Sequence, residues 1–180
     1  MTQNNSLTQW NKDYIAAIER LAHKDTAKAV SPQELLEKTG LQLLQAMTDG
    51  AVSHEGIGKT LDFVLIDIKE GETVFQGTPH AKHYNPLGTV HGGWYATLLD
   101  SAVGCAVHSM LPAGRLYTTA ELSINYLRAA TQKTGPLRAY GKVIHLGKQL
   151  AMAEGKIVDV EGKLYAHAKT TCLIFDKSDT

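Results

Sequence analysis

The residues from Gly92 to Met110 form an apolar run that restricts the possible folds of this chain. As a helix, the run is apolar on nearly every side, and Pro112 and Gly114 follow it as stop signals. A helix of this kind has to be buried on most sides, so other elements must surround it. The sequence therefore predicts one long central helix enclosed by the rest of the chain.

Short β segments lie on both sides of this helix in the sequence. They are expected at residues 61–68, 73–77, 116–127, 136–146, 149–160 and 163–175. Turn signals separate them, and the last four read as consecutive antiparallel strands of a meander. Strict alternation over 116–127 puts Thr119 on the same face as Glu121 and on the opposite face from Leu122. One helix enclosed by one antiparallel sheet is an α+β architecture.

The first fifty residues read as helical. Tyr14, Ile15, Ile18 and Leu21 form one apolar stripe. Residues 31–34 (Ser-Pro-Gln-Glu) start a second helix with a capping box, in which a break at Gly40 is possible and which Gly50 can end. Residues 51–59 are expected to be a loop. We therefore expect a helical N-terminal extension over 1–59 and a main domain over 60–176.

Charge and composition exclude several classes of partner. Lys plus Arg and Asp plus Glu both number 18, so broad attraction to nucleic acid or to an anionic membrane is not indicated. No apolar run reaches the ~18 residues of a membrane span, and the polar N-terminus does not resemble a secretion signal. Cys105 and Cys172 are expected to be buried and unpaired. The sequence predicts a cytoplasmic protein.

The loop before the central helix carries the strongest chemical signal. Residues 85–93 read Asn-Pro-Leu-Gly-Thr-Val-His-Gly-Gly and deliver His91, Gly92 and Gly93 to the helix start. Free backbone N–H groups and the helix dipole favour negative charge there, and glycine lets a ligand approach closely. This is the design of an oxyanion pocket. Nine residues after His91, Asp100 lies among apolar residues. A carboxylate in such surroundings costs free energy, which indicates a functional role.

The spacing of these residues predicts a dimer. Nine residues on a helix are about two and a half turns, so His91 and Asp100 would point in opposite directions, about 13 Å apart. One helix cannot aim both its N-terminus and Asp100 at one small reacting group. If both act together, they come from two copies of the chain.

Residues 84–93 and the Leu98-Leu99-Asp100 run resemble the PaaI-like acyl-CoA thioesterase family, named for phenylacetic acid degradation. The resemblance covers about residues 61–175. It implies a hotdog fold, in which an antiparallel sheet wraps a long central helix. It also implies hydrolysis of an acyl-CoA by a homodimer with shared active sites, often paired into a dimer of dimers. No metal and no organic cofactor are expected.

The resemblance also implies roles for individual residues. The Gly92 N–H, helped by the Asn85 side chain, would polarise the thioester carbonyl. Asp100 of the neighbouring subunit would be the general base or nucleophile. Thr119, with Thr118 as its neighbour, would help to place the attacking water. His91 would shape the loop and hydrogen-bond near the thioester, so it is counted with the catalytic residues.

Other residues of the substrate site follow from position and charge. Gly93 leaves the helix start open to the substrate. Arg128, with Lys142 and Lys148, lies in the β region and is a candidate for contact with the phosphates of coenzyme A. Thr118 is a further candidate for substrate contact.

Two other functions stay open. Enoyl-thioester hydratases of this fold use an Asp-x-Asn-Pro-x-His arrangement, but here His83 replaces the Asp and Gly88 the His. A non-catalytic acyl-CoA sensor would have no need of Asp100. His80 and His83 have a spacing that could bind a metal, but no Cys or acid cluster accompanies them.

Overall fold

The computed structural model describes residues 3–22, 30–51 and 56–177. Its α-helices are α1 (Gln3–Ala22), α2 (Pro32–Glu37), α3 (Gly40–Thr48), α4 (Ile57–Thr60) and α5 (Gly92–Ser109). Its strands are β1 (Phe63–Lys69), β2 (Glu72–Gly77), β3 (Arg115–Tyr126), β4 (Leu137–Leu146), β5 (Leu150–Val158) and β6 (Leu164–Asp176). Two short 3₁₀ helices, η1 (Ala81–His83) and η2 (Gln132–Thr134), lie in the loops. The predicted strands are thus all present, with ends shifted by at most a few residues.

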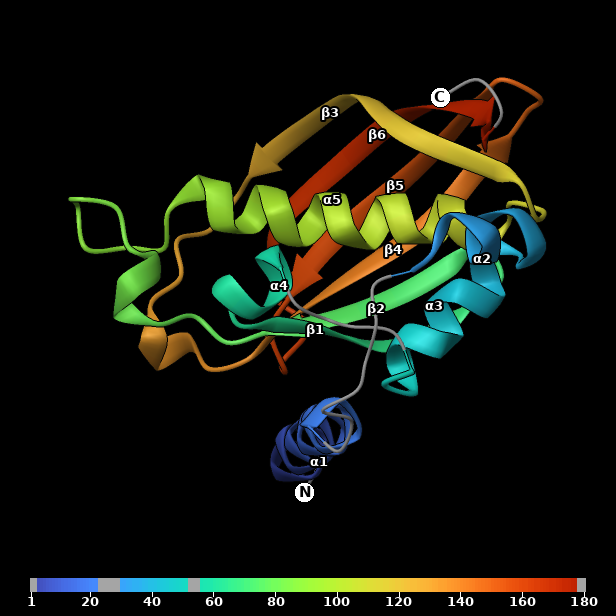
Figure 1. The fold of residues 1–180 in the computed structure, drawn as a ribbon. Helices are drawn as coiled ribbons and strands as arrows, with labels where there is room; N and C mark the ends of the chain where they lie inside the picture. The colour runs from blue at the N-terminus through green and yellow to red at the C-terminus, as the bar shows by residue number, and fades with distance from the viewer. Residues whose placement is uncertain (1–2, 23–29, 52–55, 178–180) are drawn as a thin grey trace.

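The strands form one six-stranded antiparallel sheet in the order β1-β2-β4-β5-β6-β3 (Figure 1). The expected meander is therefore wrong for its first strand, because β3 pairs with β6 at the far edge and not with β4. The chain crosses from that edge to β4 through residues 127–136. Because of this crossing, the sheet encloses α5, which packs against β2, β3, β4, β5 and β6.

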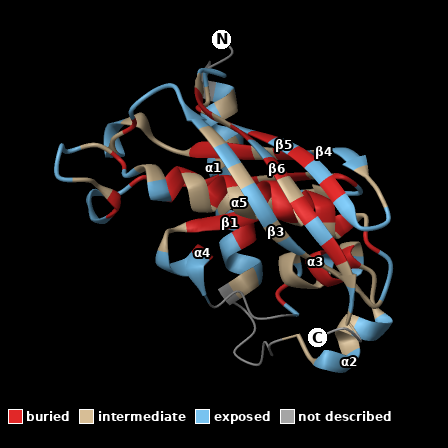
Figure 2. Cartoon of the chain, turned by 90° about the horizontal axis from the view of Figure 1, so that it is seen from above, coloured by how far each residue is buried: buried red, intermediate tan, exposed pale blue. Residues whose placement is uncertain are grey.

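Helix α5 is the centre of the core, as its all-round apolar sequence predicts. Its residues Leu98, Leu99, Ala102 and Val103 are fully buried, and burial continues along the helix in Figure 2. The helix lies directly on β4: a Cβ added at Gly141 would be 2.3 Å from the Ala102 carbonyl oxygen. The Thr73 hydroxyl of β2 donates a hydrogen bond to the same oxygen at 2.7 Å. The α+β hotdog architecture is confirmed.

Strand β3 departs from the strict alternation expected of it. Its register with β6 shifts between Thr119 and Glu121, so Ala120 is an extra residue in a β-bulge. Before the bulge Thr119 faces α5, and after it Leu122 packs on the core from the same side. The expected grouping of Thr119 with Glu121 is therefore wrong, because one inserted residue exchanges the faces.

The helical start of the chain follows its local signals. The Ser31 side chain accepts from the Glu34 N–H, and the Glu34 carboxylate accepts from the Ser31 N–H, which completes the expected capping box of α2. The expected second helix is interrupted before Gly40, so that α2 and α3 are separate helices. Gly50 follows α3 with a φ of 67°. Residues 57–60 form one turn of helix where a loop was expected, and 52–55 lie outside the described residues.

The apolar stripe expected on α1 is only partly the face that packs. Tyr14 and Leu21 are partly buried, but Ile15 and Ile18 are 54% and 41% exposed. The face of α1 that packs on the sheet contains Ala17 instead, which is buried. Arg138 of β4 contacts α1 through residues other than Ile15 and Ile18. Arg138 forms an ion pair with Asp13 at 2.6 Å and lies over the Trp10 ring at 4.5 Å.

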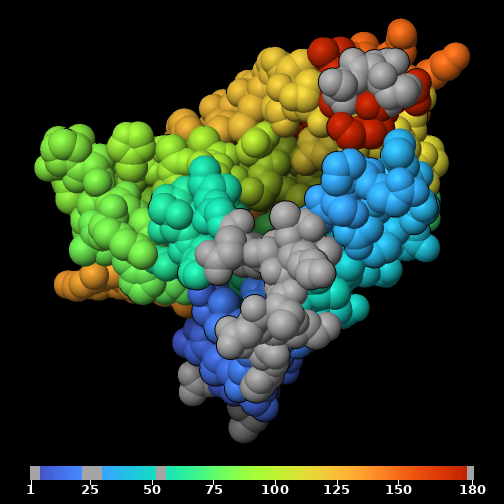
Figure 3. Space-filling view, viewed as in Figure 1, coloured from blue at the N-terminus to red at the C-terminus, as the bar shows by residue number. Residues whose placement is uncertain are grey.

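Figure 3 shows the loop that precedes α5 at one end of the molecule, separate from α1. Both cysteines are free, and Cys172 is fully buried as expected, whereas Cys105 is only partly buried. Within the described ranges, no helix is long and apolar enough to cross a membrane.

Candidate active site

The N-terminus of α5 is capped by His91. Its Nδ1 accepts a hydrogen bond from the Gly93 N–H at 2.8 Å. A neutral imidazole that accepts at Nδ1 carries its proton on Nε2. In the described part of the chain, no group accepts a hydrogen bond from the Gly92 N–H. The Trp94 N–H donates to the His91 carbonyl at 3.0 Å, so of the first three N–H groups of the helix only that of Gly92 is open to a ligand.

The Asn85 side chain holds the loop in front of this helix. Its Oδ1 accepts from the Leu87 N–H at 2.9 Å and the Thr89 N–H at 3.3 Å, and its Nδ2 donates to the Thr89 hydroxyl at 3.0 Å. The loop is closed further by a backbone bond from the Asn85 N–H to the Thr89 carbonyl at 2.8 Å. Asn85 thus fixes the loop that presents Gly92, and one of its two amide hydrogens remains for a ligand.

Asp100 and Thr119 meet inside one chain. The Thr119 hydroxyl of β3 donates a hydrogen bond to the Asp100 carboxylate at 3.0 Å, and both side chains are half-buried. A hydroxyl that donates to a carboxylate makes a charge-assisted bond and fixes the orientation of the acid. The bulge at Ala120 provides this geometry because it turns Thr119 toward α5.

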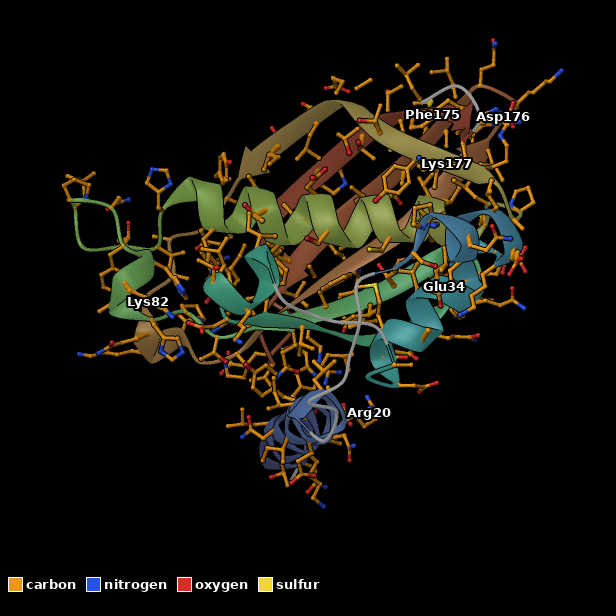
Figure 4. The ribbon with its side chains drawn as sticks, in the orientation of Figure 1. Arg20, Glu34, Lys82, Phe175, Asp176 and Lys177 are labelled. Carbon is orange, nitrogen blue, oxygen red and sulfur yellow. The ribbon has the colours of Figure 1, made fainter. Side chains whose placement is uncertain are left out.

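Gly92 and Asp100 are far apart within the chain. Helix α5 runs without interruption from Gly92 to Ser109, and eight residues of α-helix span about 12 Å. The N-terminus of α5 lies at the end of the molecule that carries Lys82, and its C-terminus lies toward Phe175 (Figure 4). The structure therefore separates the open N–H from the acid–hydroxyl pair by about 12 Å along α5.

The expected substrate-binding residues lie in different places. Gly93 is exposed at the start of α5. Arg128 is exposed just beyond β3 and is near the same end, because its carbonyl accepts from the Tyr95 hydroxyl at 3.3 Å. Thr118 points away from Asp100, on the opposite face of β3 from Thr119.

Unlike Arg128, the two lysines named with it lie away from the start of α5. Lys142 pairs with Glu72 at 3.0 Å on the sheet. Lys148 lies in the β4–β5 turn, where its carbonyl accepts from Arg115 at 2.7 Å.

Tyr126 is a site residue that sequence reasoning missed. Its hydroxyl donates to the Gly92 carbonyl at 3.2 Å, and its ring lies 3.3 Å from the position of a Cβ at Gly92. The signal was weak because Tyr126 is only the last residue of an alternating strand. Its contacts put it beside the Cα and the carbonyl group of Gly92, at the first turn of α5.

The cysteine and histidine side chains near α5 are poorly placed to act as a nucleophile or as metal ligands. Burial raises the pKa of the Cys105 thiol to about 12, so a thiolate nucleophile is disfavoured. His83 is buried, its Nδ1 accepts from the His80 N–H, and its ring stacks on Trp94, which is a structural role. No group of three or more metal-ligating side chains occurs among residues 3–22, 30–51 and 56–177.

Comparisons with known proteins agree with this fold. The E. coli PaaI protein from the phenylacetic acid degradation operon superposes with a TM-score of 0.66 at 26% identity, over 78% of this chain and 96% of that chain. A 1,4-dihydroxy-2-naphthoyl-CoA hydrolase of Listeria monocytogenes is 25% identical over 68% of this chain and 98% of its own length. A Halobacterium salinarum protein that carries the name of an esterase is 34% identical over 63% of this chain and 76% of its own length.

The enclosed helix and the antiparallel sheet define a hotdog-fold protein of the thioesterase type. The profile of the Thioesterase superfamily matches residues 87–166, from the loop before α5 to β6. The chain belongs to the thioesterase superfamily, with PaaI proteins among its structural neighbours.

Proposed function

We propose that this protein hydrolyses an acyl-CoA thioester to a free acid and coenzyme A. Asp100 acts as general base on a water molecule, Thr119 orients Asp100 and the water, and the Gly92 N–H polarises the thioester carbonyl. The observation that carries the proposal is the 3.0 Å bond between Thr119 and Asp100 beside a buried apolar core. Partial burial of a carboxylate beside apolar residues costs stability. That cost favours a functional reason for the presence of Asp100 at this position.

The chemistry requires only these groups. Asp100 takes a proton from water while the oxygen attacks the carbonyl carbon. The negative charge that develops on the carbonyl oxygen is stabilised by the Gly92 N–H and the positive end of the α5 dipole. The C–S bond then breaks, the acid leaves as product, and the coenzyme A thiolate takes the proton that Asp100 received.

A homodimer supplies both halves of each site in this proposal. Gly92 and Asp100 are separated by about 12 Å along one helix, so one protomer contributes Gly92 and its partner contributes Asp100. Strand β3 supports this assembly because it is an edge strand of the sheet, and half of its residues are exposed while none is buried (Figure 2). A dimer of dimers remains the further expectation from the resemblance.

The remaining residues support the substrate. Asn85 and His91 fix the loop and the first turn of α5, so that the Gly92 N–H stays aimed at the substrate. Gly93 keeps the approach free of side chains. Arg128, exposed near the same end, is the cation we assign to a phosphate of coenzyme A.

The first test follows free thiol release from a panel of aromatic and fatty acyl-CoAs. We expect turnover with at least one, and a loss of about 100-fold or more in the folded Asp100→Asn variant, in line with general-base catalysis. Tight binding without thiol release would indicate a sensor. Loss of the enoyl absorbance without thiol release would indicate a hydratase.

A second test addresses the oxyanion donor. Gly92→Ala places a methyl group 3.3 Å from the Tyr126 ring, on the residue whose N–H is the proposed donor. We expect kcat to fall by about 100-fold, as for loss of one oxyanion donor. The Gly92→Ala/Tyr126→Ala double variant removes the crowding and is the control. Full activity in that double variant would assign the loss to Tyr126 and not to the N–H.

A further inference from the structure

The orientation of Thr119 depends on the β-bulge of β3. Glu121 is exposed, and residues two apart on a regular strand share a face. If Ala120 paired as an ordinary residue of the ladder, with no bulge, Thr119 would therefore point outward with Glu121. Bulges re-aim side chains but leave the ladder locally unpaired, so something else has to hold this one.

Thr170 of β6 holds the bulge from the neighbouring strand. Its side chain is 1% exposed, and its hydroxyl donates to the Glu121 carbonyl at 2.8 Å. That carbonyl directly follows the extra residue, at the point where the register shifts. A buried hydroxyl thus satisfies a backbone group of the bulge.

Cys172 lies directly opposite Thr119 in the β3–β6 register and is fully buried. Its thiol forms a hydrogen bond with Thr119 and lies 3.9 Å from the Thr170 hydroxyl oxygen. Burial raises the pKa of the Cys172 thiol, so its proton stays on the sulfur. The Thr119 proton goes to Asp100 and the Thr170 proton to the Glu121 carbonyl, so the Cys172 thiol proton is the one left to donate to a threonine oxygen.

We propose that Thr170 and Cys172 are positioning residues that keep the Thr119 hydroxyl aimed at Asp100. Thr170 fixes the backbone of the bulge, and Cys172 donates to the Thr119 oxygen, which leaves the Thr119 proton for the carboxylate. Neither side chain reaches the space where a substrate would lie. This inference rests on the proposed hydrolysis for its effect on rate, but the orientation of Thr119 can be measured without substrate.

The kinetic test uses Thr170→Val, which keeps the shape and removes the hydroxyl. We expect kcat to fall about 3- to 10-fold with KM little changed, since one buried hydrogen bond is lost. Thr171→Val is the matched control, because Thr171 lies next along β6 with its side chain on the other face. It should leave kcat unchanged.

A double variant separates positioning from general damage. In a Thr119→Ala background, Thr170→Val should lower kcat no further, because the hydroxyl it positions is gone. An equal loss in both backgrounds would overturn the inference. Thermal unfolding of each variant reports the change in stability separately.

The test without substrate measures NMR three-bond couplings to the Thr119 Cγ2, which report its χ1 rotamer. We expect one rotamer in the wild type, Thr171→Val and Cys172→Ser, and averaged couplings in Thr170→Val and Cys172→Ala. Unchanged couplings in both of the latter would refute the inference. If the wild type hydrolyses no acyl-CoA, the proposed function fails, and these couplings still decide the role of Thr170 and Cys172.

Discussion

Mixing two inactive variants should restore activity if each site takes Gly92 from one protomer and Asp100 from its partner. The first variant, Asp100→Asn, lacks the base. The second, Gly92→Val, adds a bulky side chain at the proposed donor, where even a Cβ would lie 3.3 Å from the Tyr126 ring. Each homodimer carries the same lesion in both of its sites, so each should retain no more than about 1% of wild-type activity.

A mixed dimer has one site with both lesions and one site with neither. Random exchange at equal concentrations makes about half of the dimers mixed, and each has one intact site of two. The mixture should therefore recover about one quarter of the wild-type specific activity. The magnitude follows from the length of α5, which keeps Gly92 and Asp100 of one chain about 12 Å apart.

The assay is thiol release from the best acyl-CoA of the panel, before and after exchange. Native mass spectrometry of isotope-labelled chains shows whether mixed dimers have formed. Each variant exchanged with itself is the control and should stay inactive. If mixed dimers form and activity stays at the level of the controls, the site lies within one protomer, and the argument from helix geometry is refuted.

Three further predictions concern orientation, pH and packing. Thr119→Ala should lower kcat by about 10-fold, which is less than the loss caused by removal of the base. Thr119→Ser and Thr118→Ala should both keep a kcat close to that of the wild type. A large loss of kcat in Thr118→Ala would contradict the observed bulge. Burial lowers the His108 pKa below its ordinary 6.5, so the unfolded chain binds this proton at higher pH than the folded chain, and stability is full above pH 6.5 and falls as pH drops through it. Urea unfolding at about pH 7.5 and about pH 5.5 should show a smaller loss in His108→Gln, and an unchanged loss would contradict this. Gly141→Ala would place a Cβ 2.3 Å from the Ala102 carbonyl oxygen and should cost about 3 kcal/mol in the same assay; an unchanged unfolding midpoint would show that α5 and β4 can separate freely.

Local signals in the sequence determined the individual elements. The capping box at Ser31 and the stop at Pro112 act through hydrogen bonds and φ/ψ limits a few residues apart, so these helix ends can be read directly. The apolar circumference of α5 required an enclosing sheet. The position of Asp100, nine residues after His91, required the two to lie far apart on one helix.

Only the tertiary structure decided which partners these elements have. The pairing of β3 with β6 depends on how the sheet closes around α5, which no local pattern contains. The extra residue Ala120 exchanges the faces of β3, and a rule of strict alternation along the strand cannot predict such an insertion. Whether Thr119 reaches Asp100 depends on buried contacts from β6, some fifty residues later in the chain. Such contacts form only when distant segments pack, because side-chain periodicity specifies a face of a strand but not its neighbour.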